Sequence, residues 1–203
     1  MKNKILLLFV FFSLLFISGC ESKGDNMENY LEGNHYVEMS VKDYGIIKLK
    51  LDADLAPITV TNFINLVNDK FYDGLTFHRI IEGFMIQGGD PNANGTGGSP
   101  VKIKGEFALN GISNSISHLR GTVSMARRGD DMNSASSQFF IVHDDSTFLD
   151  GGYAAFGYVT DGMDVVDEIA KNAIVEDDNG TVKFENQPVI DYIKVIDNNI
   201  IEK

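Results

Sequence analysis

Short apolar segments separated by turn residues recur along most of this chain, and their spacing constrains the fold more than any other feature. Residues 35–41 (HYVEMSV) and 46–52 (IIKLKLD) alternate apolar and polar side chains on either side of a short turn, which predicts a β-hairpin. Apolar residues recur at helical spacing in residues 59–69 and 164–171. Further strands are expected near 75–81, 84–87, 122–126, 138–142, 155–159 and 188–197.

Many short strands with two separated helices indicate a mainly β protein, in which an antiparallel barrel has its open ends plugged by the helices. Between the fourth and fifth expected strands lies a long irregular stretch, residues 88–121. Loops of this length inside a compact domain usually carry function.

The first 20 residues, MKNKILLLFVFFSLLFISGC, have the pattern of a secretory signal, because two lysines precede an apolar run from Ile5 to Ile17. That run is shorter than the roughly 20 residues that a transmembrane helix needs. It ends in Ile17-Ser18-Gly19-Cys20, which resembles the lipobox of bacterial lipoproteins with isoleucine in place of the usual leucine. We expect a lipoprotein signal peptide over residues 1–19 and a lipid on Cys20. The alternative is an ordinary signal peptide with a chance cysteine.

Cys20 is the only cysteine, so the chain cannot form an intramolecular disulfide. A single thiol in a secreted chain needs an explanation, and acylation supplies one. Residues 20–33 are expected to combine this anchor with a polar, flexible tether, and residues 34–199 to form one domain with a substantial core. The expected location is extracytoplasmic, with the lipid holding the protein on the bacterial cell membrane.

The acidic balance of the chain limits its partners. It carries 29 acidic and 17 basic side chains, a formal net charge of −12. Removal of residues 1–19, which contain two lysines and no acid, would leave 15 basic side chains and a charge of −14. Nucleic acid is therefore not expected as a partner, nor is anionic lipid as the main one. We expect a monomer.

The sequence shows little hydrolytic or cofactor-binding machinery. Its four histidines form no HExxH pair, and it has no GxSxG elbow, dinucleotide fingerprint or P-loop. Potential metal ligands do not cluster, and the acidic turn at 177–180 lacks the spacing of a calcium loop. No cofactor or metal is expected. A Ser/His/Asp triad assembled from distant residues stays open.

Arg79 stands out because it lies inside an apolar strand, in FHRIIEGFMIQGGD at 77–90. A charge is costly to bury unless it is paired or used. Arg79 is surrounded by large apolar residues and glutamines, a set without a nucleophile or a cofactor. Such a set could catalyse rotation about an X–Pro peptide bond, because this reaction breaks no covalent bond. A guanidinium aimed at the proline nitrogen would bind the twisted amide better than either planar form. The alternative is that Arg79 pairs with a surface acid.

Residues 44–98 resemble the cyclophilin family of peptidyl-prolyl isomerases almost end to end, and FHRII-x-GFMIQGGD is a very specific motif of that family. Residues 118–127, 136–142 and 148–159 and the helix from Asp164 continue the resemblance in order. The resemblance implies a closed eight-stranded antiparallel β-barrel capped by two α-helices. It also implies a peptidyl-prolyl cis-trans isomerase that needs neither cofactor nor ATP, with Arg79 as its catalytic residue.

The resemblance further implies a substrate groove with a pocket for the proline ring. The pocket residues would be Phe84, Met85, Phe140 and Leu149, and the residues that line the groove would be Gln87, Ala126 and Gln138. At the groove edge, Phe148 and Tyr153 replace the tryptophan and histidine of familiar eukaryotic members. Both keep an aromatic ring, so these departures concern inhibitor binding more than isomerisation. Arg127 and Arg128, in a loop that looks slightly longer than in short forms, are expected to be solvated.

The sequence thus predicts a lipid-anchored isomerase that acts on proline-containing exported proteins while they fold. One alternative is a groove that binds proline segments without catalysis, or serves as a holdase chaperone. Another is a solute-binding lipoprotein of a transporter, which fits poorly because the chain is short and lacks a two-lobe α/β pattern. Without the motif, Phe84, Met85 and Phe140 would be interpreted as ordinary core residues.

Overall fold

The computed structural model of the protein describes residues 30–197, so the predictions made for Cys20 and the signal segment lie outside it. Each predicted strand and helix is present, with ends that differ by at most two residues from those expected. The elements are β1 (Asn34–Val41), β2 (Gly45–Asp52), α1 (Pro57–Asn68), β3 (Phe77–Ile81), β4 (Met85–Gly88), η1 (Ala108–Asn110), β5 (Thr122–Met125), β6 (Phe139–Val142), η2 (Thr147–Leu149), β7 (Ala155–Asp161), α2 (Met163–Asn172), η3 (Phe184–Asn186) and β8 (Ile190–Val195).

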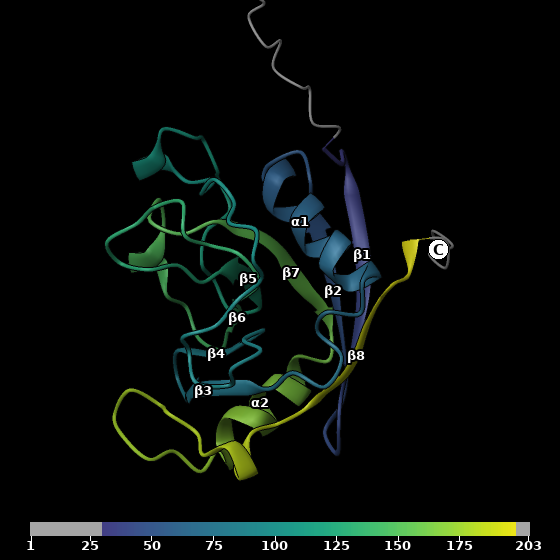
Figure 1. The fold of residues 1–203 in the computed structure, drawn as a ribbon, viewed down its shortest axis with the longest axis vertical. Coiled ribbons are helices and arrows are strands. Elements are labelled where there is room, and N and C mark those ends of the chain that lie inside the picture. Colours follow the sequence, from purple (N-terminus) through teal and green to yellow (C-terminus); the bar gives the residue numbers. More distant parts are fainter. Residues whose placement is uncertain (1–29, 198–203) are drawn as a thin grey trace, which may run out of the picture.

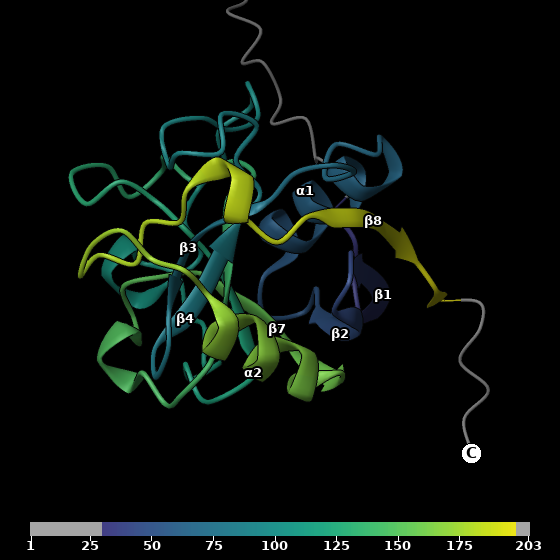
Figure 2. The same ribbon diagram turned by 90° about the horizontal axis from the view of Figure 1, so that it is seen from below.

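The eight strands form one antiparallel sheet in the order β3-β4-β6-β5-β7-β2-β1-β8. Register shifts interrupt the pairs β1–β8, β2–β7, β3–β4 and β5–β7. Such bulges bend strands and increase their twist, and the sheet curls into the half-barrel of Figure 1. Helix α1 packs against β2 and β8, and α2 against β2 and β4. Figure 2 shows the two helices on different sides of the molecule.

The half-barrel is open, so the prediction of a closed barrel is wrong in this respect. The edge strands β3 and β8 approach each other at their first residues, where Thr76 and Val189 form an isolated bridge. Farther along β3, its free edge is occupied by another segment, since Ile80 donates from its backbone N–H to the Gly180 carbonyl at 2.8 Å. Pro188, which has no N–H to donate, also limits pairing between the segments that lead into β3 and β8.

The concave face of the sheet encloses an aromatic core into which α1 inserts Phe63. The ring of Phe63 lies 5.0 Å from that of Tyr72, 5.6 Å from that of Phe139 and 5.2 Å from that of Phe156. These rings are fully buried and meet at tilted or edge-on angles, the arrangements that aromatic pairs prefer. The core therefore fixes β6 and β7 against α1, and the outer faces of the same strands are free to build a site.

Buried carboxylates form hydrogen bonds that fix both halves of the long loop between β4 and β5. Buried Asp90 accepts hydrogen bonds from the backbone N–H groups of Asn92 (2.8 Å) and Gly95 (2.6 Å). Burial would raise the pKa of Asp90, but these and neighbouring backbone hydrogen bonds outweigh it and lower the pKa. A Cβ on Gly97 would collide with the Asp90 carboxylate, so position 97 of the loop requires glycine.

Glu106 in the second half of the loop caps α1, which has no side-chain cap of its own. Its buried carboxylate accepts hydrogen bonds from Ile58 N–H at 3.0 Å and from the Thr59 N–H and hydroxyl at 2.8 and 2.6 Å. A carboxylate at this position also complements the helix dipole. Within residues 30–197, none of the helices combines the length and the apolar character of a membrane span.

Candidate functional site

A bulge in the β3–β4 pair determines the direction in which Arg79 points. Phe77 pairs with Gly88 and Arg79 with Gln87, so His78 is an extra residue on β3. In a regular strand, Phe77 and Arg79 would share one face because they are two positions apart. Here Phe77 is fully buried in the core, whereas Arg79 lies on the outer face beside Met85 and Phe84.

The strand register continues the site from Arg79 across the sheet. Gln87 of β4 pairs with Arg79 on one side and with Phe140 of β6 on the other. Because neighbouring strands lie about 4.8 Å apart, the three side chains form a continuous row. A small apolar cluster surrounds this row, separate from the main core. It consists of Met85, Phe140 and Val142, with Ile81, Phe84, Ala126, Leu149 and Tyr153 packed against it.

A cavity of about 130 Å³ opens in this cluster, with apolar side chains and polar groups in its lining. It is smaller than the roughly 300–1,000 Å³ of pockets for drug-sized ligands, so it offers room for one small ring. Eight of the ten residues predicted for the protein site line it, together with Arg127. The lining residues are Arg79, Phe84, Met85, Gln87, Ala126, Arg127, Phe140, Leu149 and Tyr153.

The guanidinium of Arg79 is held at the edge of this cavity. Its Nε donates to the Asn179 carbonyl at 2.8 Å, and its Nη1 donates to Gln87 Oε1 at 3.3 Å and lies 4.0 Å from the sulfur of Met85. Burial lowers the pKa of Arg79, an effect opposed by Tyr153 and Asp177, and an arginine stays charged at neutral pH. None of the ion pairs found within residues 30–197 includes Arg79, which argues against the alternative of a surface pair.

Gln138 lies one step beyond the cavity and supports Gln87. Gln87 Nε2 donates to Gln138 Oε1 at 2.9 Å, and Gln138 Nε2 donates to the carbonyls of Gly95 and Gly97 at 3.0 and 2.8 Å. This relay connects Arg79 to the loop that Asp90 fixes. Gln138 also lines a second cavity of about 410 Å³, whose charged lining residues are Lys102, Arg127 and Arg128.

Phe148 occupies the rim of the site and does not line the small cavity. Its side chain is 76% exposed, and its ring lies 5.6 Å from that of Phe84. The exposed ring extends the apolar surface outward from the cavity. It provides no hydrogen-bond donor there.

Arg127 belongs to the site, and the prediction that it is a solvated loop residue is wrong. Its guanidinium lies between two rings, with its carbon 5.2 Å from the centre of Phe107 and 4.8 Å from that of Tyr153. Its Nε also donates to the Gly152 carbonyl at 2.8 Å. Arg128, by contrast, is exposed and forms a forked pair with a neighbouring aspartate. No local sequence signal distinguishes the two arginines, because the rings that hold Arg127 are distant in the chain.

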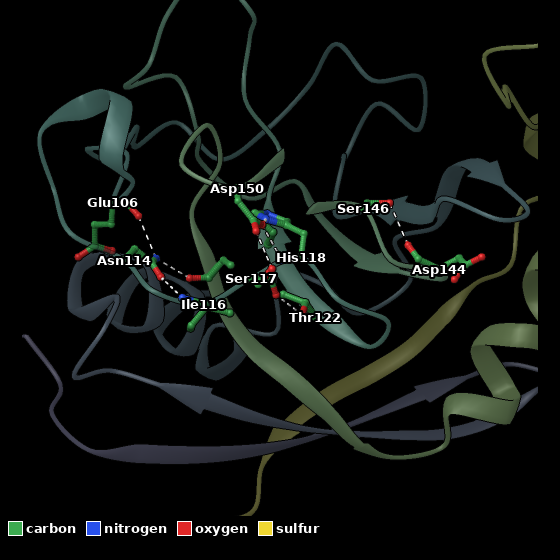
Figure 3. Close-up of polar contacts among 11 residues, drawn as sticks. Glu106, Asn114, Ile116, Ser117, His118, Thr122, Asp144, Ser146 and Asp150 are labelled. Atoms are coloured by element: carbon green, nitrogen blue, oxygen red, sulfur yellow. Dashed lines mark hydrogen bonds and ion pairs between the residues drawn. The ribbon is translucent and has the colours of Figure 1, made fainter. Parts of the chain in front are cut away.

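Behind the cavity, the structure contains a Ser/His/Asp arrangement, shown in part in Figure 3. His118 Nδ1 lies 2.8 Å from Asp150 Oδ1, and His118 Nε2 lies 3.0 Å from Ser124 Oγ. Ser124 and His118 are fully buried and neither lines the cavities next to Arg79, so no substrate reaches the hydroxyl. The triad left open by the sequence is therefore not a nucleophilic site.

This buried network instead supports the cavity from below. The His118 ring stacks on Phe140 with a centroid distance of 6.0 Å, and burial lowers the pKa of His118 although Asp150 opposes this. Asp150 follows the cavity residue Leu149 and also accepts a hydrogen bond from Ser117 Oγ at 2.6 Å, as Figure 3 shows. This support was not predicted, because Asp150 and His118 are 32 positions apart in the chain. Residues 30–197 contain no group of three or more potential metal ligands.

Comparisons with known proteins agree on one family. Residues 36–196 match the family described as cyclophilin type peptidyl-prolyl cis-trans isomerase/CLD. A peptidyl-prolyl cis-trans isomerase of Synechococcus elongatus is 49% identical over 117 residues, which cover 58% of this chain and 75% of the relative. Peptidyl-prolyl cis-trans isomerase B of Bacillus subtilis is 46% identical over 132 residues, which cover 65% of this chain and 85% of the relative.

Solved structures show the same similarity. A crystal structure of a Cryptosporidium parvum cyclophilin type peptidyl-prolyl cis-trans isomerase has a TM-score of 0.71 and 28% sequence identity, covering 80% of this chain and 98% of that one. A structure of that protein in the presence of the dipeptide Ala-Pro has a TM-score of 0.70 and 28% identity, covering 79% and 98%.

Proposed function

The chain belongs to the cyclophilin-type peptidyl-prolyl cis-trans isomerases, and we propose that Arg79 catalyses the reaction beside the 130 Å³ cavity. The observation that carries this proposal is the position of the guanidinium. It is held by a backbone carbonyl and by Gln87 at the edge of a cavity that has room for one ring and is lined in part by Phe84, Met85, Phe140 and Leu149.

The barrier to rotation about an X–Pro bond is amide resonance, which amounts to about 18–20 kcal/mol. In the twisted state, the proline nitrogen loses conjugation and regains a lone pair. A donor aimed at that nitrogen stabilises the twisted state more than either planar state, which is the condition for catalysis. Arg79 suits this role because its guanidinium keeps its charge and its orientation is fixed before substrate binds.

The remaining site residues would bind different parts of the substrate. Phe84, Met85, Phe140 and Leu149 would enclose the proline ring, while Gln87 would hold Arg79 and contact the substrate backbone. A well-aimed donor contributes about 3–4 kcal/mol, and each tenfold in rate requires about 1.4 kcal/mol. Any acceleration beyond roughly a thousandfold must therefore also use ring burial and orientation.

Arg79→Ala tests this assignment in a proline-isomerisation assay on a short peptide. We expect kcat/KM to fall at least tenfold, with an unchanged Tm, and Arg79→Lys to recover only part of the loss because a point charge cannot reproduce the planar fork. Lys48→Ala is the matched control, since it removes an exposed cation that pairs with Asp161 on another part of the sheet. Equal activity of Arg79→Ala and wild type would refute the assignment. Peptide binding without isomerisation by the wild type would favour the alternative of a non-catalytic binding module or holdase.

We also propose that the protein works outside the cytoplasm as a monomer, held on the bacterial membrane by a lipid on Cys20. The support is the sequence alone: a charged start, a short apolar run and one cysteine after small residues. Its substrates would be proline-containing segments of exported proteins, whose folding it would assist. The relative's structure with Ala-Pro supports a proline-containing ligand.

A further inference from the structure

His143, the residue after β6, holds the β3–β4 turn that carries Phe84. The Gly83 N–H donates to His143 Nδ1 at 3.0 Å, and the His143 N–H donates to the Phe84 carbonyl at 2.9 Å. Within the turn, the Phe84 N–H donates to the Ile81 carbonyl at 3.0 Å. The histidine ring therefore supplies the side-chain contact that joins this turn to the end of β6.

The hydrogen bond from Gly83 defines the state of the ring. Since Nδ1 accepts a hydrogen, it carries none, and the neutral ring must hold its proton on Nε2. Nε2 lies 3.3 Å from Asp167 Oδ1 of α2, an ion-pair distance at which that oxygen makes no hydrogen bond. Arg120 fixes the same neighbourhood, because it donates to Asp167 Oδ2 and to the His143 carbonyl, each at 2.7 Å.

We propose that His143 is a positioning residue for the isomerase reaction and that it acts only in its neutral form. A protonated imidazole donates from both nitrogens, so it cannot accept the Gly83 N–H, and the turn loses this contact. Phe84 lines the cavity, and its ring lies 5.9 Å from the Arg79 guanidinium carbon. Loss of the contact therefore loosens one wall of the proline pocket. The inference rests on the proposed function, because it assumes that this cavity binds proline.

Charged groups approach His143 from several elements. Asp167 comes from α2 and Arg120 from the segment before β5, while Asp145 accepts a hydrogen bond from the Arg120 N–H at 2.8 Å. Asp144 is the next residue in the chain, and Glu82 lies in the turn itself. Of these groups, Asp167 lies against the ring, and the switch acts through the direction of the Gly83 hydrogen bond.

The sign of the pH effect follows from this geometry. Protonation removes the acceptor nitrogen from an imidazole, so falling pH can only weaken the Gly83 contact and rising pH can only restore it. His78 and His118, the other histidines near the cavity, both have pKa values lowered by burial. They are therefore protonated later in an acid titration than an ordinary histidine.

The test measures kcat and KM from pH 8 to pH 5 for the wild type and three variants. His143→Asn offers a carbonyl oxygen that can accept the Gly83 N–H without titrating, and His143→Ala offers no acceptor. At pH 8 we expect the Asn variant to match the wild type and the Ala variant to lose roughly two- to tenfold in kcat/KM, mainly through KM. Towards pH 5 the wild type should fall to the level of the Ala variant, while the Asn variant stays level with its own activity at pH 8.

The control is His35→Asn, which removes a histidine that pairs with Asp197 at the far end of β1. It should follow the wild-type pH profile. Identical pH profiles for wild type and His143→Asn would overturn the inference, even if the Ala variant failed to fold. An active wild type with an equally active, folded Ala variant at pH 8 would also overturn it. A wild type that is inactive at pH 8 would overturn the proposed function, and this inference with it.

Discussion

Arg127→Ala should lower the thermal stability and the activity on a neutral peptide together, whereas Arg128→Ala should change neither. Arg127 contacts two rings, at 4.8 and 5.2 Å, and donates two hydrogen bonds of 2.8 Å to backbone carbonyls. Each cation–π contact contributes about 0.5–1 kcal/mol, and each hydrogen bond about 0.5–1.5 kcal/mol net. Since the carbonyls can turn to water, we expect a loss of about 2–3 kcal/mol in the free energy of unfolding.

For a domain of this size, such a loss corresponds to a fall in Tm of roughly 4–12 °C, which calorimetry would detect. Tyr153, which Arg127 holds, lines the 130 Å³ cavity beside Arg79, so kcat/KM should fall about three- to tenfold. Arg127→Lys should fall in between, because an ammonium cannot lie as a plane between two rings. Arg128 and Asp130 are exposed, with 65% and 69% of their side-chain surface accessible. If the two alanine variants melt at the same temperature and isomerise equally well, the argument for Arg127 is wrong.

Cys20→Ser should abolish lipid labelling and release the protein from the membrane fraction; retention there would contradict the lipobox. Cyclosporin inhibits relatives that carry tryptophan at the position of Phe148. Phe148→Trp, alone or with Tyr153→His, should tighten cyclosporin binding about tenfold to hundredfold with little change in kcat/KM, because an indole supplies the donor that phenylalanine lacks. Unchanged affinity in both variants would show that this donor is not what limits binding. Lys102→Glu should reduce kcat/KM for peptides with an acidic residue beside proline about two- to fivefold relative to neutral peptides. The reason is that the charged residues lining the 410 Å³ cavity, which include Lys102, are all basic. An equal effect on acidic and neutral peptides would contradict a role of this charge in substrate binding.

The order of the strands and helices could be predicted because alternation marks the strands and helical spacing marks the helices. Alternation in 46–52 and helical spacing in 59–69 each reflect which side of an element faces the core, and burial in β2 and α1 follows these patterns. The motif around Arg79 contains four of the nine cavity residues, and the later segments that resemble the cyclophilin family contain the four others that were predicted. These residues could be named because the chain resembles the cyclophilin family at their positions, whereas periodicity alone would assign Phe84, Met85 and Phe140 to the core.

The supports of the site could not be predicted in this way. Glu106 caps α1 from 47 or 48 positions away in the chain, and Asp150 reaches His118 from 32 positions away. A loop carboxylate in a sequence looks the same whether it meets a helix N-terminus, a histidine or water. Arg127 presents the same difficulty, because the aromatic rings on either side of it come from separate loops. The prediction of a closed barrel was wrong for a related reason, since the free edge of β3 is occupied by a loop segment that carries no strand signal.

The bulge at His78 shows most clearly why the site needs the three-dimensional fold. Simple alternation would place Phe77, Arg79 and Ile81 on one face, so either the core would lose a ring or the groove would lose its guanidinium. The extra residue lets Phe77 and Ile80 face the core while Arg79 faces outward. The bulge leaves the His78 ring buried, with nitrogens that make no hydrogen bond within residues 30–197. Burial keeps this ring neutral by lowering its pKa. β-Bulges commonly aim one side chain away from its strand, and here the bulge lets an apolar core strand present a cation to the 130 Å³ cavity.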